Sequence, residues 1–220
     1  MKNNEGLQHD VQEAIKRESL LNAAKIGVIA QDGIITITGT VDSYAKKRAA
    51  EHAAKTVPGV LAVVEQIEVK FGKHGKRNDL EIALELINVM GQHPTMSKTN
   101  ILVKVEDGCV TLEGDVDFYL YRETAQKTVE IVKGVKNLIN KIQVNSKTTD
   151  AVEKKTINDA LIRNWAIDEK MIKVDVFGNK VTLSGMVNSI FQRDEAERLT
   201  WNAPGVWTVH NELLIDYASI

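Results

Sequence analysis

The chain has 220 residues, and its 28 basic and 30 acidic side chains give a formal net charge of -2. This balance disfavours a nucleic-acid-binding protein, because neutralising a phosphate backbone takes a clustered basic surface. Hydrophobic residues make up 43% of the chain, which excludes a disordered protein. The single cysteine, Cys109, excludes an intrachain disulfide.

The first residues indicate where the protein is located. Residues 1–6 lead directly into a polar, helix-like pattern, without the apolar stretch of a secretion signal. No window approaches the 18 or so apolar residues that a membrane span requires. We therefore expect a cytoplasmic protein, or a periplasmic one if a signal has been removed from its start.

A ten-residue segment occurs three times along the chain, as DGIITITGTV (32–41), DGCVTLEGDV (107–116) and GNKVTLSGMV (178–187). A Gly-Val pair follows twenty residues after the last glycine of each segment. The paired glycines are Gly39 and Gly59, Gly114 and Gly134, and Gly185 and Gly205. The copies are offset by 75 and 71 residues and align without gaps, which predicts three tandem modules at residues 4–70, 79–145 and 150–216.

The first half of each copy predicts a helix followed by a β-hairpin. A polar residue that can accept a first-turn N–H opens the helix, and apolar residues then recur at helical spacing. Alternating apolar residues flank a tight turn in which glycine and asparagine tolerate positive φ. The capping residues are Asn4, Asp79 and Asp150, and the turns are Asp32-Gly33, Asp107-Gly108 and Gly178-Asn179.

The second half of each copy predicts another helix and a returning strand. Asp42, Asp117 and Asn188 occupy one equivalent position, and each is a candidate N-cap. The second glycine of each pair closes the helix, and apolar residues of a third strand follow it. The module is therefore an α+β unit of the order αββαβ, with a right-handed crossover expected.

The three copies allow an internal test for chemistry, because a catalytic or metal site built into the module should recur. Apart from glycines, caps and apolar positions, only a strand threonine (Thr36, Thr111, Thr182) and a basic residue of the second helix recur. None of the five histidines has the spacing of a helical zinc motif, and no glycine-rich phosphate loop opens a helix. We interpret Cys109 as an ordinary strand residue and expect no enzyme activity, metal or cofactor.

The recurring basic residue is Lys47, Arg122 or Arg193. At Lys47 the position lies on the flank of the second helix, where the stem can cover apolar surface while the charged end reaches water. One interpretation is a structural residue with a local carboxylate partner. The other is a phosphate contact, which arginine can make in bidentate fashion.

Large apolar residues distinguish the second helices of the later copies. The second copy has Phe118-Tyr119-Leu120-Tyr121 directly before Arg122, and Leu120 is predicted to lie opposite the core. In the third copy Phe191 takes the same exposed position, and Trp201 is predicted on the outer face. These residues suit contact with a lipid headgroup or a protein partner. Burial against a neighbouring module is the alternative.

This pattern resembles the BON domain (bacterial OsmY and nodulation), also called the transport-associated domain. The family pattern has an apolar strand, a turn glycine, V-x-L-x-G-x-V, a basic residue in the second helix, and Gly-Val before the last strand. In the second copy the matching residues are Val110, Leu112, Gly114, Val116, Arg122, Gly134 and Val135, and Lys47 and Arg193 take the basic position elsewhere.

The resemblance implies a bacterial protein whose modules are small mixed three-stranded sheets with two helices on one side. It also implies a non-enzymatic, stress-related role in binding anionic phospholipid surfaces or envelope proteins. Many family members are exported, and this sequence departs from them by lacking a signal. The alternative function is protein–protein interaction or self-association without lipid.

Overall fold

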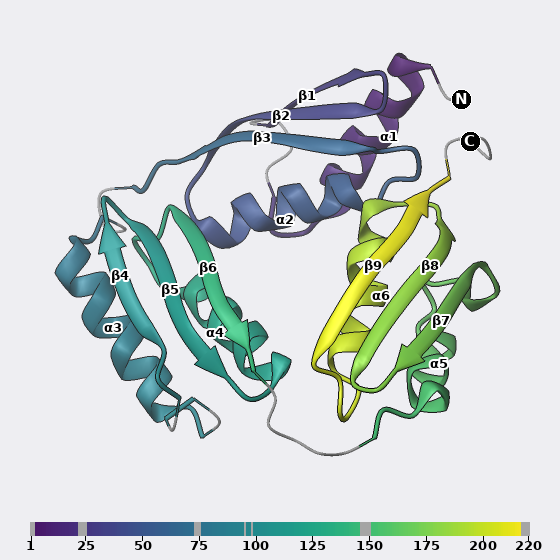
Figure 1. Ribbon diagram of the computed structural model, residues 1–220. Helices are drawn as coiled ribbons and strands as arrows, with labels where there is room; N and C mark the ends of the chain where they lie inside the picture. Colours follow the sequence, from purple (N-terminus) through teal and green to yellow (C-terminus); the bar gives the residue numbers. More distant parts are fainter. Residues whose placement is uncertain are drawn as a thin grey trace. The chain divides into compact units, whose positions relative to one another are not determined.

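A computed structural model describes residues 3–21, 26–72, 76–94, 96–97, 99–145 and 151–216. It contains three α+β modules, each with its own three-stranded sheet (Figure 1). The predicted αββαβ order is confirmed in all three. The elements of module 1 are α1 (Asn4–Arg17), β1 (Ile26–Gln31), β2 (Ile34–Val41), α2 (Tyr44–Lys55) and β3 (Ala62–Val69).

Modules 2 and 3 repeat this order. The elements of module 2 are α3 (Asp79–Gln92), β4 (Leu102–Glu106), β5 (Cys109–Val116), α4 (Tyr119–Ile131) and β6 (Asn137–Val144). The elements of module 3 are α5 (Lys154–Arg163), the 3-10 turn η2 (Glu169–Met171), β7 (Ile172–Phe177), β8 (Lys180–Val187), α6 (Ile190–Trp201) and β9 (Thr208–Ile215).

Each sheet has its second strand in the middle, in the orders β1-β2-β3, β4-β5-β6 and β7-β8-β9. In modules 2 and 3 the hairpin strands pair antiparallel, and the last strand returns parallel to the middle strand. The tight turn forces the first arrangement, and the crossover helix permits the second. The mixed sheet that the family resemblance implied is thereby confirmed.

The two helices and one face of the sheet enclose a separate core in module 2 and in module 3. In module 2, Ile82 and Leu86 of α3, Val110 and Leu112 of β5 and Val129 of α4 are fully buried. In module 3, the equivalent core includes Ile157, Leu161, Val181, Leu183 and Ala196. The opposite face of each sheet carries the alternate, more exposed strand residues, as the period of two requires.

The hairpin turn and the Gly-Val loop recur together because they are hydrogen-bonded to each other. In module 2 the N–H of Lys136 donates to the carbonyl oxygen of Gly108 at 2.8 Å. Leu61 donates to Gly33 at 2.8 Å in module 1, and Trp207 donates to Asn179 at 2.9 Å in module 3. Two sequence segments that lie more than twenty residues apart thus form one end of the sheet.

In modules 1 and 2 the predicted caps of the first helices were wrong by one residue. Asn3 caps α1 by accepting from the N–H of Gly6 at 2.8 Å. Asn78 caps α3 by accepting from the N–H of Glu81 at 2.9 Å, and the Glu81 carboxylate accepts from the Asn78 N–H in return. In module 3 the residue before the helix, Glu153, makes no side-chain cap, and the predicted cap Asp150 lies outside the described residues.

Asn4 and Asp79, which were predicted as caps, instead bind the hairpin turn of their own module. The Asn4 side chain accepts from the N–H of Asp32 at 2.9 Å. The Asp79 carboxylate accepts from the N–H groups of Asp107 and Gly108 at 2.8 and 2.9 Å. The first helix is thus tied to a turn 28 or 29 residues further along.

The caps predicted for the second helices also lie one residue too early. Ser189 caps α6 by accepting from the N–H of Gln192 at 3.2 Å, and Ser43 accepts more weakly from Lys46 at 3.4 Å. Phe118 precedes α4 without a side-chain cap. Asp42, Asp117 and Asn188 stand one position before these residues.

The third hairpin turn differs from the prediction at Asn179. Asp32 and Asp107 have φ of 49° and 50°, and each precedes a glycine that also has positive φ. In module 3 Gly178 has φ of 60°, whereas Asn179 does not have positive φ. The Asn179 side chain instead donates to the carbonyl oxygen of Gly205 at 2.6 Å, which holds the turn against the Gly-Val loop.

Candidate functional site

The described part of the chain contains no group of three or more His, Cys, Asp or Glu side chains that could hold a metal ion. His9, His52 and His210 are exposed and His93 is half-buried, while His74 lies outside the described residues. Cys109 is a half-buried free thiol at the start of β5. In the same part of the chain, no helix is long and apolar enough to cross a membrane.

Two surface carboxylates have a lowered pKa. A hydrogen bond from Lys16 holds the pKa of Glu13 below its usual value, and Lys173 does the same for Asp175. Both shifts arise from neighbouring lysines on exposed surface. A lowered pKa keeps a carboxylate ionised at neutral pH, so neither group is poised as a general acid.

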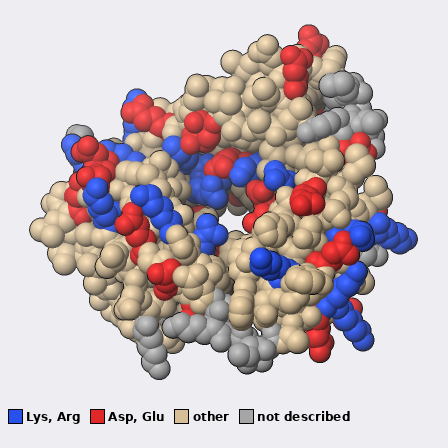
Figure 2. Space-filling view, viewed as in Figure 1, with Lys and Arg blue, Asp and Glu red and all other residues tan. Residues whose placement is uncertain are grey.

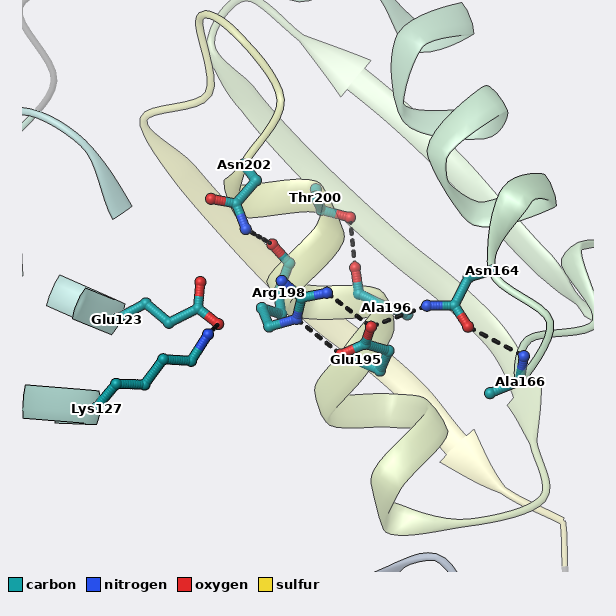
Figure 3. A network of polar contacts seen from close by, with 9 residues as sticks. All are labelled: Glu123, Lys127, Asn164, Ala166, Glu195, Ala196, Arg198, Thr200 and Asn202. Carbon is teal, nitrogen blue, oxygen red and sulfur yellow. Dashed lines mark hydrogen bonds and ion pairs between the residues drawn. The ribbon is translucent and has the colours of Figure 1, made fainter. Parts of the chain in front are cut away.

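The most connected polar network in module 3 is satisfied within the module (Figure 3). Arg198 donates twice to Glu195, through Nε and Nη2, at 2.7 Å each, and Asn164 donates to the same carboxylate at 2.8 Å. These contacts tie α6 to the end of α5. The network is therefore structural.

Charged side chains of both signs are interspersed on the surface. On the face that Figure 2 shows, basic and acidic residues alternate, and large areas carry neither. Module 2 has seven basic and ten acidic residues between positions 79 and 145. Contact with an anionic surface must therefore come from a local feature.

The aromatic start of α4 is arranged largely as its sequence predicts. Leu120 is 51% exposed, which confirms its predicted outward position. Phe118 is also exposed, and its ring meets that of Tyr121 edge to face with centroids 5.4 Å apart. Tyr121 is half-buried and packs against the core of module 2. Leu120 and Phe118 thus form a small apolar surface at the end of this helix.

The corresponding prediction for module 3 was wrong. Phe191 is half-buried rather than exposed. Trp201, predicted on the outer face of α6, packs against the core of module 3 together with Leu199 and Ala203. A helical projection treats side chains as points, whereas an indole on the last turn is large enough to reach the edge of the core.

The recurring basic residue differs between the modules. Lys47 is half-buried on α2, and Arg193 is exposed on α6. Arg122 is half-buried on α4, with its guanidinium carbon 5.8 Å from the centre of the Tyr119 ring. The Nε of Arg122 is buried and has no hydrogen-bond partner.

An exposed apolar feature on α3 was not predicted from the sequence. Leu80, Leu84 and Ile87 are 67%, 58% and 59% exposed, and their spacing of four and three residues places them on one side of the helix. We call these three residues the α3 stripe. The equivalent residues are polar, charged or small in the other modules: Glu5, His9 and Gln12, and Ala151, Lys155 and Asn158. The stripe is therefore a property of module 2.

These features define a tandem array of small α+β modules. The BON domain model matches residues 3–70, 78–146 and 149–217, and the chain belongs to the BON-domain family. The chain is also similar to the osmotically-inducible protein Y of Escherichia coli (strain K12). The two are 27% identical over 158 residues, which cover 68% of this chain and 79% of that protein.

Two solved structures of CdsD, a structural protein of the type III secretion system of Chlamydia trachomatis, also match along the chain. Both are 14% identical, with TM-scores of 0.28 and 0.24. The first match covers 98% of this chain and 100% of that one, and the second covers 97% and 95%. Because these TM-scores are low, the two matches say nothing about the function of the chain or the arrangement of its modules.

Proposed function

We propose that the chain is a non-enzymatic binding protein whose second module attaches it to anionic phospholipid surfaces. The α3 stripe is the observation that carries this proposal. Three large side chains on one side of a helix form an apolar face, while Ile82 and Leu86 on the other side hold the helix on the sheet. An apolar face of this kind can enter the headgroup region of a bilayer.

The apolar contact must supply most of the binding free energy. Full burial of each large aliphatic side chain is worth about 1.5–3 kcal/mol, whereas each basic residue near an anionic surface adds about 1 kcal/mol. Lys76 is exposed before α3, but Arg77 forms an ion pair with Glu85. Among the described residues, few basic side chains are thus available beside the stripe, and the leucines and isoleucine are the main anchor.

Similarity to an osmotically-inducible protein suggests when the chain acts. We infer that it is produced under osmotic stress, when a membrane surface changes its tension and lipid packing. The measurement is protein abundance in the source bacterium before and after an osmotic upshift. A rise supports this setting, and unchanged abundance contradicts it.

Vesicle binding tests the membrane proposal. The double variant Leu84→Ser/Ile87→Ser should weaken co-sedimentation with phosphatidylglycerol vesicles at least about tenfold, since each tenfold step corresponds to about 1.4 kcal/mol. Ile162→Ser, which changes an exposed apolar residue of α5, is the matched control and should bind normally.

Two results would contradict the proposal. If the unmodified protein fails to bind phosphatidylglycerol or cardiolipin vesicles at low salt, the membrane function is wrong. If it binds and the double variant binds equally well, the stripe is not the anchor. Circular dichroism of each variant establishes that the fold is intact.

Glu81 and Glu85 favour a second candidate function. Both carboxylates lie on α3 beside the stripe, and they would oppose an anionic surface while solubilising the rim of a protein interface. In this case the stripe binds a second copy of the chain. Sedimentation velocity at increasing concentration would then show association without lipid, and Leu84→Ser/Ile87→Ser would abolish it.

A further inference from the structure

Two buried side-chain nitrogens in the described part of the chain have no hydrogen-bond partner, and both belong to module 2. They are Nε of Arg122 on α4 and Nδ2 of Asn140 on β6. Buried donors are almost always paired, because desolvating an N–H without a partner is costly. Each of these two nitrogens therefore lacks the acceptor that a buried donor normally has.

Module 3 shows where the amide of Asn140 points. Asn140 pairs with Leu112 in its sheet, and Asn211 pairs with Leu183 at the equivalent position. Each asparagine accepts, through Oδ1, from the N–H two residues along its own strand, at 3.1 Å from Ile142 and 3.3 Å from Leu213. Since the two side chains have the same anchor, we infer that Nδ2 of Asn140 is directed toward α4, where it makes no hydrogen bond.

In module 3 this amide is fully occupied. Nδ2 of Asn211 donates to the carbonyl oxygen of Arg193 at 3.1 Å and to the Glu197 carboxylate at 2.9 Å. Arg193 is the equivalent of Arg122, so the asparagine amide reaches the backbone at the recurring basic residue. The carboxylate one helical turn later supplies the negative charge.

Module 2 lacks that carboxylate. Gln126 stands where module 3 has Glu197, and its amide nitrogen donates to Glu130 at 3.2 Å. Module 1 has glutamates at both positions, Glu51 for Gln126 and Glu65 for Asn140. Of the three modules, only the second has a basic residue here without an acidic residue at either position.

We propose that module 2 contains an oxyanion site in which Arg122 and Asn140 bind a phosphate group. Two oxygens of a phosphate monoanion share one charge, as the two oxygens of a carboxylate do, and can accept from both orphaned donors. The Tyr119 ring, beneath the Arg122 guanidinium, supports that side chain. The phosphate comes from a free ion or from a phospholipid headgroup. Only the headgroup source rests on the proposed function.

Nuclear magnetic resonance can observe both donors directly. The full chain is titrated with inorganic phosphate and, separately, with glycerophosphoglycerol, which is the soluble headgroup of phosphatidylglycerol. We expect saturable shifts of the Arg122 Nε–H and Asn140 side-chain amide signals, while the Asn211 amide signals stay in place. The absence of a saturable shift at Arg122 and Asn140 overturns the proposal and leaves the two donors to solvent water.

A matched pair of substitutions tests the missing carboxylate. Gln126→Glu gives module 2 the acid that module 3 has, and it should lower the affinity for both probes at least about tenfold. Glu197→Gln makes the opposite change in module 3 and should leave the affinity of Arg122 and Asn140 unchanged. Arg122→Gln, which removes Nε, should abolish binding. Equal affinity in Gln126→Glu contradicts the proposal.

The same variants separate this site from the membrane function. If both soluble probes bind but phosphatidylglycerol vesicles do not, the oxyanion site stands with a free ion as its ligand, and the membrane function fails. If vesicles bind and neither soluble probe shifts Arg122 or Asn140, the oxyanion site fails and the α3 stripe stands. Vesicle binding weakened by Gln126→Glu identifies the headgroup as the source.

Discussion

Gly114 occupies a position in β5 where its φ is 134° and where a Cβ atom would collide with the carbonyl oxygen of Asn100. Gly185 is in the same position against Met171 in module 3, with φ of 123°. Both the dihedral angle and the space therefore require glycine. This explains why the glycine recurs in every copy although it lies within a strand.

We predict that Gly114→Ala destabilises the protein by about 2 kcal/mol or more, because it combines an unfavourable φ with a backbone clash. Gly91→Ala is the control. Gly91 lies in α3 with open space around its Cα, so alanine there should stabilise by about 0.5–1 kcal/mol. Urea unfolding measures both free energies. Similar values for the two variants would contradict the steric explanation.

Single residues also show where sequence-based prediction ends. Asn3-Asn4 and Asn78-Asp79 are pairs of adjacent polar residues, and either member can cap a helix. The choice depends on the turn, 28 or 29 residues away, that the second member binds. The orphaned donors of Arg122 and Asn140 were beyond prediction for the same reason, since they depend on contacts between α4 and β6.

At the scale of elements, α3 has apolar residues on two sides. Ile82 and Leu86 face the core, and the α3 stripe faces outward. The helical spacing of the core residues predicts the first set but says nothing of the second. The equivalent positions in the other modules carry polar, charged or small residues, and this difference would have identified the stripe. Leu120 was predicted correctly from its position opposite the core side of the second helix.

The attachment of α3 to the hairpin turn yields an element-scale prediction. Asp79→Ala removes the acceptor for two turn N–H groups and should destabilise the protein by about 1–3 kcal/mol. Asp117→Ala, at a position that was wrongly predicted as a cap, should change the stability by less than about 0.5 kcal/mol. Thermal unfolding compares the two. If Asp117→Ala destabilises the protein by more than about 0.5 kcal/mol, Asp117 caps α4 as the sequence predicted.

At the scale of the whole molecule, the chain is an array of repeated units, and the cores of modules 2 and 3 are separate from each other. The order of elements, the hairpins and the family were all predictable, because repetition triples each weak local pattern. Trp201 and Phe191 were not predictable, because burial at a helix end depends on side-chain size and on the surfaces around it.

Separate cores predict local consequences for a core substitution. Leu112→Ala in β5 should cost about 2–5 kcal/mol, because it leaves a cavity in a fully buried position. Amide hydrogen exchange should then accelerate in β4, β5 and β6 and stay unchanged in β7, β8 and β9. Equal acceleration in both sheets would show that modules 2 and 3 unfold as one cooperative unit.

The asparagines of β6 and β9 have a consequence for how a tandem chain avoids misassembly. Both strands lie at the border of their sheets, where unpaired N–H groups can recruit a strand from another chain. Asn140 and Asn211 bind the N–H of Ile142 and Leu213 with their own side chains. A foreign strand must displace an intramolecular contact to add there, which protects modules 2 and 3 from polymerising border to border.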